Sequence, residues 1–289
     1  MKSLNWNPWF GCHKCSTGCS FCWVSDKVVR NAKDFNTPIR KHKGSTKHKT
    51  EKYELQYKIE SGTIINVCTN SDFFIEEADY MRDEAWQIIH DRTDCLFHIV
   101  TKRPERVLQC LPKMWLDGWN NVLLSVSVED KFSFDIRGSI LLELGMRGFN
   151  HLGLVLEPLI EEVDIMPYIG TGMIDQVILG GENYYGVRAL ARPLEINWVT
   201  KIKEQCELLG VPFIFRSTGS RFRVPDGSLV NVKYYDQKGL AEFYGLSILE
   251  GDSLVENWES TVEDIQLREL EEKAHIVYNK IQGAKKHGK

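Results

Sequence analysis

Short apolar runs recur along the chain and alternate with segments of helical periodicity. Six of these runs end in polar residues, at 63–70, 95–106, 121–130, 151–159, 175–183 and 211–218. Buried parallel strands of βαβ units are typical of this pattern. Together with a very short strand near Leu4–Trp6, the runs predict seven parallel strands.

Helices are predicted between these runs. An amphipathic segment covers 76–92, a helix-like segment reaches about Met114, and another covers 133–146. Further on, five apolar residues fall on one helical face, and Gly210 after them is typical of a helix C-cap. These five are Ile196, Val199, Ile202, Cys206 and Leu209.

No GxGxxG fingerprint follows any of the runs, and this favours a barrel over a dinucleotide-binding fold. We therefore expect an α/β fold, a partial (β/α) TIM-like barrel with parallel strands, an N-terminal loop rich in cysteine and a C-terminal helix. In barrels, polar residues at the carboxyl ends of strands form the active site. The residues in that position are Thr69, Asn70, Ser71, Asp72, Thr101, Lys102, Arg103, Ser125, Ser127, Glu129, Glu157, Gly180, Gly181, Glu182, Asn183 and Arg216.

The pattern weakens beyond Gly219. A turn at Pro225–Gly227 predicts a hairpin, and a capping box of Ser260 and Glu263 begins a predicted closing helix. We expect residues 1–219 to form the barrel and 220–289 to form an extension packed on it.

Composition and charge are those of an ordinary soluble protein, with 26% charged residues and a net charge of −4. No apolar run approaches the roughly 20 residues of a membrane span, and no signal segment opens the chain. The sequence therefore predicts a cytoplasmic protein without membrane association. The stretch Lys27–Lys58 holds ten lysines and arginines, so a nucleic-acid partner is one interpretation and a solvated surface is the other.

Four of the eight cysteines, Cys12, Cys15, Cys19 and Cys22, lie in the stretch GCHKCSTGCSFCW at 11–23. A reducing compartment favours a metal or redox role over disulfides. Either Cys12 or Cys15 with Cys19 and Cys22 could bind three irons of a cubane, and four thiolates could instead close a zinc site. The C-x2-C pairs Cys12/Cys15 and Cys19/Cys22 lie in one short loop, whereas zinc modules commonly take two such pairs from separated segments, and this favours iron. Aromatic neighbours such as Trp9, Phe21 and Trp23 would shield a cluster. The other cysteines, Cys68, Cys95, Cys110 and Cys206, are expected to be buried apolar residues.

The cysteine stretch resembles the signature of the radical S-adenosylmethionine superfamily. A closer resemblance, over Trp6 to about Gly219, is to a phage- and prophage-associated family of unassigned function, distantly similar to spore photoproduct lyase. It is carried by WNPWFGC, STGCSFC, TNSDFF, VTKRPERV, NVLLSVSVED, LEPL, VILGGEN, R-P and GVPFIFR, in this order. The family's three cysteines match Cys12, Cys19 and Cys22, while the superfamily spacing starts at Cys15. Arg216 stands where the family has a lysine.

The resemblance implies a [4Fe-4S] cluster with one open iron, S-adenosyl-L-methionine bound at that iron, an external electron donor and a 5′-deoxyadenosyl radical. The strand-end residues would orient the cofactor: Asn70, Ser71 and Asp72 at the methionyl ammonium, and Ser125, Ser127 and Glu129 at the ribose. The segment Gly180-Gly181-Glu182 is similar to the superfamily's GGE element, although it follows a later strand. Glu157, Glu182 and Lys102 are the residues we expect to act on a substrate.

Similarity to the lyase favours a nucleotide or nucleic-acid substrate, and a small metabolite remains the alternative. Two other functions compete with the radical enzyme. One is a zinc-stapled nucleic-acid-binding or adaptor protein without catalysis, and the other is a metal-independent enzyme in which Glu157 and Glu182 act as acid and base.

Overall fold

The computed structural model describes residues 3–22, 24, 39–40, 59–115, 119–184 and 190–248. The chain divides into two compact units, Met1–Ser253 and Leu254–Lys289. The helix predicted from Ser260 and almost all of the basic stretch Lys27–Lys58 lie outside the described residues.

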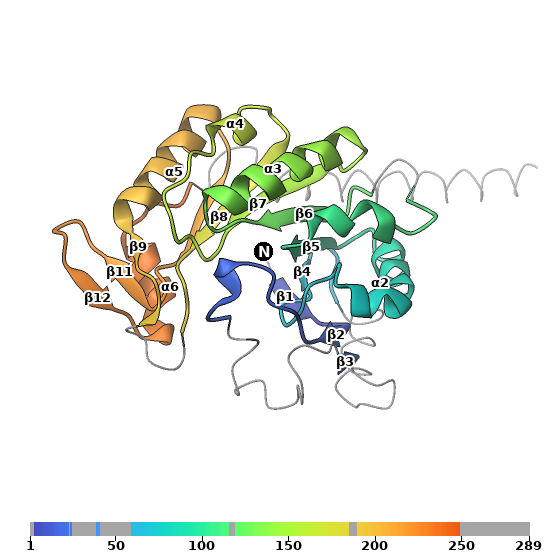
Figure 1. Cartoon of the computed structure of the whole chain (residues 1–289). Coiled ribbons are helices and arrows are strands. Elements are labelled where there is room, and N and C mark those ends of the chain that lie inside the picture. The colour runs from blue at the N-terminus through green and yellow to red at the C-terminus, as the bar shows by residue number, and fades with distance from the viewer. Residues whose placement is uncertain are drawn as a thin grey trace, which may run out of the picture. The chain divides into compact units, whose positions relative to one another are not determined.

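Seven parallel strands form one sheet that curls into a half-barrel with helices interleaved between the strands (Figure 1). The order of the strands in the sheet is their order in the chain. This is expected when the chain crosses back after each strand and begins the next, parallel strand at the same end of the sheet. The strands are β1 (Ser3–Trp6), β4 (Ile64–Val67), β5 (Leu96–Thr101), β6 (Val122–Ser127), β7 (His151–Leu156), β8 (Ile174–Gly180) and β10 (Phe213–Ser217). The predicted α/β half-barrel of parallel strands and all seven predicted strands are confirmed.

Four helices lie in the connections between strands of this sheet: α2 (Asp79–Asp91), α3 (Lys131–Met146), α4 (Met166–Ile169) and α5 (Ile196–Leu209). A capping box of Asp130 and Ser133 begins α3. Gly210, in the left-handed conformation at φ 68°, ends α5 as predicted. The helix-like segment predicted after β5 consists only of short 3-10 turns at Pro104–Arg106 and Leu108–Cys110. Leu111 leaves the helical region at ψ 143°, because the proline that follows it disfavours the helical conformation.

Two small sheets accompany the half-barrel. In one, the predicted hairpin is present as the antiparallel pair β11 (Arg221–Arg223) and β12 (Leu229–Asn231), and β9 (Leu194–Glu195) pairs with β11. The other joins β2 (Trp9–Phe10) to β3 (Ile39–Arg40). The helix α6 (Tyr234–Phe243), which contacts β10, was not predicted, since only Gln237 and Ala241 of it are buried and its apolar stripe is weak. The domain boundary at 219 stays a prediction.

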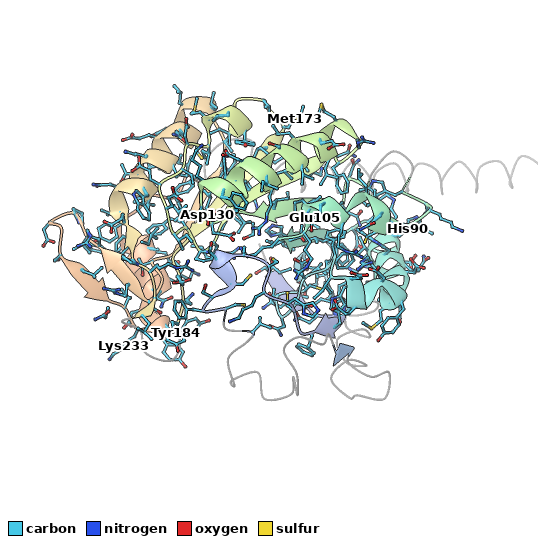
Figure 2. The ribbon with its side chains drawn as sticks, in the orientation of Figure 1. His90, Glu105, Asp130, Met173, Tyr184 and Lys233 are labelled. Atoms are coloured by element: carbon cyan, nitrogen blue, oxygen red, sulfur yellow. The ribbon has the colours of Figure 1, made fainter. Side chains whose placement is uncertain are left out.

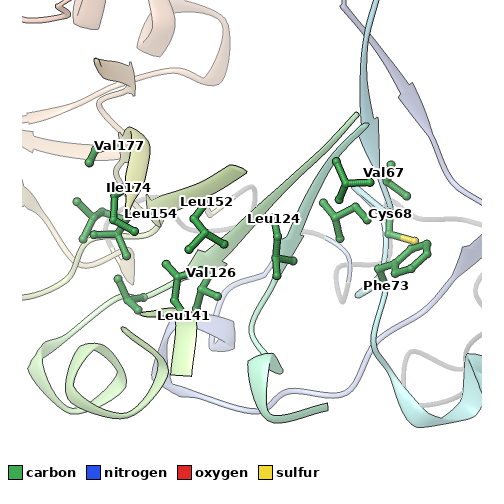
Figure 3. Close-up of a cluster of buried hydrophobic side chains, with 14 of the residues drawn as sticks. Val67, Cys68, Phe73, Leu124, Val126, Leu141, Leu152, Leu154, Ile174 and Val177 are labelled. Atoms are coloured by element: carbon green, nitrogen blue, oxygen red, sulfur yellow. The ribbon is translucent and has the colours of Figure 1, made fainter. Parts of the chain in front are cut away.

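The hydrophobic core lies between the sheet and its helices (Figure 3). On β6, Val122, Leu124 and Val126 belong to this core, while Ser125 and Ser127 alternate with them and face the other side of the sheet. That second, concave side therefore carries polar groups, and it leads to the carboxyl ends of the strands. None of the helices in the described part of the chain is long and apolar enough to cross a lipid bilayer.

Candidate functional site

The cysteine loop (residues 11–22) is attached to the carboxyl edge of the sheet through the segment that follows β4. Gly11 forms a parallel bridge with Ser71, and its amide donates to the carbonyl of Asn70 at 3.2 Å. The Ser71 hydroxyl donates to the carbonyl of Gly11. Just before the loop, the indole of Trp9 donates to the carbonyl of Asp72 at 3.1 Å. Asn70 and Ser71 thus hold the start of the loop against the sheet.

Asp72 and Arg103 form a buried ion pair beneath Cys12. The Asp72 carboxylate accepts hydrogen bonds from the Thr101 hydroxyl (2.8 Å), the amides of Phe74 (2.9 Å) and Lys102 (3.0 Å), and the Arg103 guanidinium (3.0 Å). Arg103 also donates to the carbonyl of His13 at 2.8 Å and to the Sγ of Cys12 at 3.5 Å. One guanidinium therefore joins the end of β5 to the backbone and thiol of the loop.

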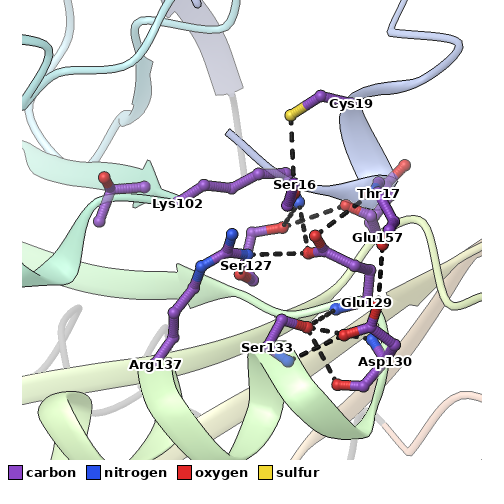
Figure 4. Close-up of polar contacts among 12 residues, drawn as sticks. Ser16, Thr17, Cys19, Lys102, Ser127, Glu129, Asp130, Ser133, Arg137 and Glu157 are labelled. Carbon is purple, nitrogen blue, oxygen red and sulfur yellow. Dashed lines mark hydrogen bonds and ion pairs between the residues drawn. The ribbon is translucent and has the colours of Figure 1, made fainter. Parts of the chain in front are cut away.

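Glu129, at the end of β6, holds the middle of the loop (Figure 4). Its carboxylate is fully buried and accepts from the Gly18 amide at 3.3 Å, from Lys102 at 3.0 Å and from Arg137 at 2.9 Å. Burial raises the pKa of Glu129, but Lys102, a hydrogen bond from Ser16 and Arg137 lower it more, so that the net shift is downward. The carboxylate is therefore the stable form at neutral pH.

Two polar contacts continue from Glu129 into the cysteine loop. The Ser16 hydroxyl lies 3.7 Å from the Sγ of Cys19, which connects this thiol to the Glu129 network. The Thr17 hydroxyl donates to Asp130 at 2.7 Å (Figure 4), and Asp130 lies at the beginning of α3 (Figure 2). The loop is thus fixed to α3 as well as to the sheet.

A third attachment comes from the far side of the half-barrel. Glu182, buried after β8, accepts from the backbone amide of Arg192 at 2.8 Å and pairs with the Arg192 guanidinium, which donates to the carbonyl of Thr17 at 2.8 Å. A Cβ on Gly181 would lie 2.3 Å from the carbonyl oxygen of Thr218. The glycine here allows the ends of β8 and β10 to approach closely.

The four thiols differ in their surroundings. Cys19 is buried, Cys12 and Cys22 are half-buried, and Cys15 is exposed. Burial, and then the charge of Asp72, raise the pKa of Cys12 to about 12. A hydrogen bond with Cys15 lowers the pKa of Cys19 and raises the pKa of Cys15. Over the described residues, no three His, Cys, Asp or Glu side chains are placed to hold a single metal ion.

The concave side of the sheet continues the site below the loop. Lys102 donates to the Ser127 hydroxyl at 2.7 Å, and Ser127 donates to the carbonyl of Glu157 at 3.1 Å. The Glu157 carboxylate pairs with Arg216 at 3.0 Å, and a Cβ on Gly180 would lie 2.9 Å from that carboxylate. The glycine leaves room for Glu157.

Ser125 lies deeper, on the same side of β6. Its hydroxyl is 2.8 Å from His98, and both side chains are buried. A Cβ on Gly153 would lie 2.2 Å from the Ser125 hydroxyl oxygen, so this position on β7 has room for no side chain. Burial, and to a lesser extent Arg216, lower the pKa of His98 to about 3, which keeps the imidazole neutral.

The structure thus gathers most of the predicted site residues around the loop. Lys102, Ser127, Glu129 and Glu157 form one connected network, and Glu182 reaches the loop through Arg192. Their roles toward a cofactor or substrate stay predictions. The four other cysteines, Cys68, Cys95, Cys110 and Cys206, are buried as predicted.

Three important residues of the site were not identified from the sequence. Arg137 lies on a helix with no motif around it, Gly18 was noted only as part of the cysteine stretch, and Arg192 only as part of the R-P motif. The alternation of Val126, Ser127 and Val128 predicts that Glu129, the next residue, lies on the concave side of the sheet. No sequence pattern predicts that Glu129 pairs with Arg137.

Comparisons with known proteins give a family without an assigned activity. A family model described as protein of unknown function (DUF5131) matches residues 2–275, and the chain therefore belongs to this family. No curated protein matches the chain, and no solved structure matches it.

Proposed function

We propose that this member of the DUF5131 family is a radical S-adenosylmethionine enzyme that uses a [4Fe-4S] cluster. The observation that supports the proposal most directly is the attachment of the cysteine loop to the carboxyl ends of the strands. The loop is tied to the segments that follow β4, β5 and β6 and, through Arg192, to the segment that follows β8. The carboxyl ends of strands are where barrel enzymes place their reactive groups.

The donor set fits such a cluster. Cys19 and Cys22, with Cys12 as the third ligand, would supply three thiolates, and one thiolate per iron does not require the sulfurs to converge on one point. Arg103 and Ser16 place polar groups beside the sulfurs of Cys12 and Cys19, a type of contact that tunes iron–sulfur centres. When bound, the cluster supplies the electron that cleaves S-adenosylmethionine to a 5′-deoxyadenosyl radical.

The residues of the chain would orient the cofactor and exclude water. Asn70, Ser71 and Asp72 follow β4 and lie beside the start of the cysteine loop. Ser125 and Ser127 belong to β6, and Glu129 follows it. We propose these two groups, with the backbone of Gly180 and Gly181, as the cofactor-binding surface. Glu157, Glu182 and Lys102 are the residues we propose to act on the substrate.

Anaerobic reconstitution with iron and sulfide tests the proposal. We expect about four irons per chain, an electron paramagnetic resonance signal after reduction, and 5′-deoxyadenosine upon addition of S-adenosylmethionine. Colourless protein that binds zinc through the same cysteines would instead support a non-catalytic adaptor. Activity that survives replacement of every loop cysteine would support a metal-independent enzyme.

We propose a nucleotide or nucleic acid as the substrate, on the basis of the ten lysines and arginines between Lys27 and Lys58. The lysine and arginine side chains around the site do not add to this positive charge, because each is paired with a carboxylate. The pairs are Lys102 with Glu129, Arg103 with Asp72, Arg192 with Glu182 and Arg216 with Glu157. Binding to short DNA and RNA should weaken steeply with salt. Reversal of Lys41, Lys43, Lys47 and Lys49 to glutamate should abolish that binding, and binding unchanged by this reversal would contradict a role of the basic stretch.

A further inference from the structure

Arg103 differs from the other arginines at the strand ends because it contacts both a buried carboxylate and one of the loop sulfurs. Its guanidinium pairs with Asp72 at 3.0 Å, donates to the carbonyl of His13 at 2.8 Å and lies 3.5 Å from the Sγ of Cys12. The side chain is nearly buried, with 10% exposure. Asp72, held by three further donors, leaves the guanidinium little freedom to turn away from the sulfur.

We propose that Arg103 is a positioning residue that sets the reduction potential of the cluster through a charge-assisted hydrogen bond to the Cys12 thiolate. This inference rests on the proposed function. Hydrogen bonds to ligand sulfurs and net charge near a cluster are two of the properties that set its potential. A cationic donor disperses the negative charge of the thiolate, and this stabilises the more negative, reduced state.

The planar fork of arginine is needed for this arrangement. Two of its nitrogens reach Asp72, Cys12 and the carbonyl of His13 at the same time. A lysine ammonium keeps the charge but cannot reproduce a fixed fork. Replacement by lysine therefore separates the effect of the hydrogen-bond geometry from that of the charge.

The chain offers a matched control at the opposite end of β5. There Arg92 pairs with Asp94 at 2.7 Å, donates to the carbonyl of Ile59 at 2.8 Å and lies 3.0 Å from the Sγ of Cys95. This arginine has the same three kinds of partner, but Cys95 precedes the strand and belongs to no proposed cluster site.

The test is a redox titration of the anaerobically reconstituted full chain, monitored by electron paramagnetic resonance. We expect Arg103→Gln to shift the midpoint potential to a more negative value at unchanged iron content. Arg103→Lys should give a smaller shift in the same direction, and Arg92→Gln should give none. Arg103 variants that hold full iron at the wild-type potential would overturn the inference.

A second measurement does not require that the Arg103→Gln variant bind the cluster. Wild-type protein labelled with 15N-arginine should show a nitrogen hyperfine coupling to the reduced cluster, and the labelled Arg103→Lys variant should lose it. A wild-type cluster without that coupling would overturn the role of Arg103 while leaving the proposed function intact. A wild-type chain that takes up no iron would overturn the proposed function itself, so the two failures are distinguishable.

Discussion

The amide of Gly18 donates to the carboxylate of Glu129 at 3.3 Å, and a Cβ on Gly18 would lie 2.9 Å from the carboxyl carbon. The cysteine loop and the end of β6 are therefore in direct contact at a position where only glycine fits. Because Glu129 is also held by Lys102 and Arg137, its side chain cannot easily move aside. This contact fixes the height of the loop above the sheet.

Replacement of Gly18 by alanine should displace the loop from Glu129. We expect Gly18→Ala to lower the free energy of unfolding by about 1–3 kcal/mol, as overpacking of a filled site does, and to reduce iron uptake. Chemical denaturation and iron analysis would measure both. Gly239→Ala in α6 is the matched control, since a Cβ there would meet no atom within 4 Å. Equal iron uptake in the Gly18 and Gly239 variants would contradict the proposed seat of the loop.

The contact between Gly18 and Glu129 also shows what the sequence could not reveal. The strands were predictable because each is a local run, such as the one that forms β6, with turn or helix signals on both sides. Gly18 and Glu129 are 111 residues apart, and their pairing depends on the curvature of the sheet, for which one sequence has no local signal. The ion pair of Arg103 with Asp72, which are 31 residues apart, was missed for the same reason, although both residues were placed at strand ends.

The choice of the first cluster ligand gives a second prediction. Cys12 is half-buried and contacts Arg103, whereas Cys15 is exposed. We therefore expect Cys12→Ser, Cys19→Ser and Cys22→Ser each to abolish the iron–sulfur absorption, and Cys15→Ser to retain it. Iron per chain after anaerobic reconstitution is the measurement. The opposite outcome, in which Cys15→Ser loses iron and Cys12→Ser retains it, would assign the superfamily spacing to this chain.

The pair of Glu182 and Arg192 gives a third prediction. Arg192→Ala removes the guanidinium from the buried carboxylate of Glu182, which keeps only the backbone amide of residue 192 as a donor. Because the Arg192 side chain is itself 31% exposed, we expect a cost of about 1–3 kcal/mol. In a double-mutant cycle with Glu182→Gln, the two costs should not add, and the coupling energy should be about 0.5–3 kcal/mol. Denaturation of the metal-free chain supplies all four free energies.

An exposed ion pair serves as the control for this cycle. Arg147 and Glu143 lie on the surface of α3, where coupling of about 0.2–1 kcal/mol is expected. If the coupling energy of Glu182 and Arg192 is no larger than that of Arg147 and Glu143, then Arg192 contacts Thr17 without being positioned by Glu182.

The acid sensitivity of the fold should depend on His98. Burial lowers the pKa of His98 to about 3, from 6.5 for an ordinary histidine. Between these two pH values the unfolded chain binds a proton that the folded chain does not, so the stabilising contribution is complete above pH 6.5 and is lost progressively toward pH 3. His98→Gln should therefore show a shallower decline in the free energy of unfolding from pH 6.5 to 3, with a difference on the order of a few kcal/mol. Urea denaturation of the metal-free chain at several pH values measures this difference. The half-exposed His90→Gln on α2 should keep the wild-type slope. A His98→Gln profile parallel to wild type would show that the folded chain binds a proton at His98 as readily as the unfolded chain does, which contradicts the lowered pKa.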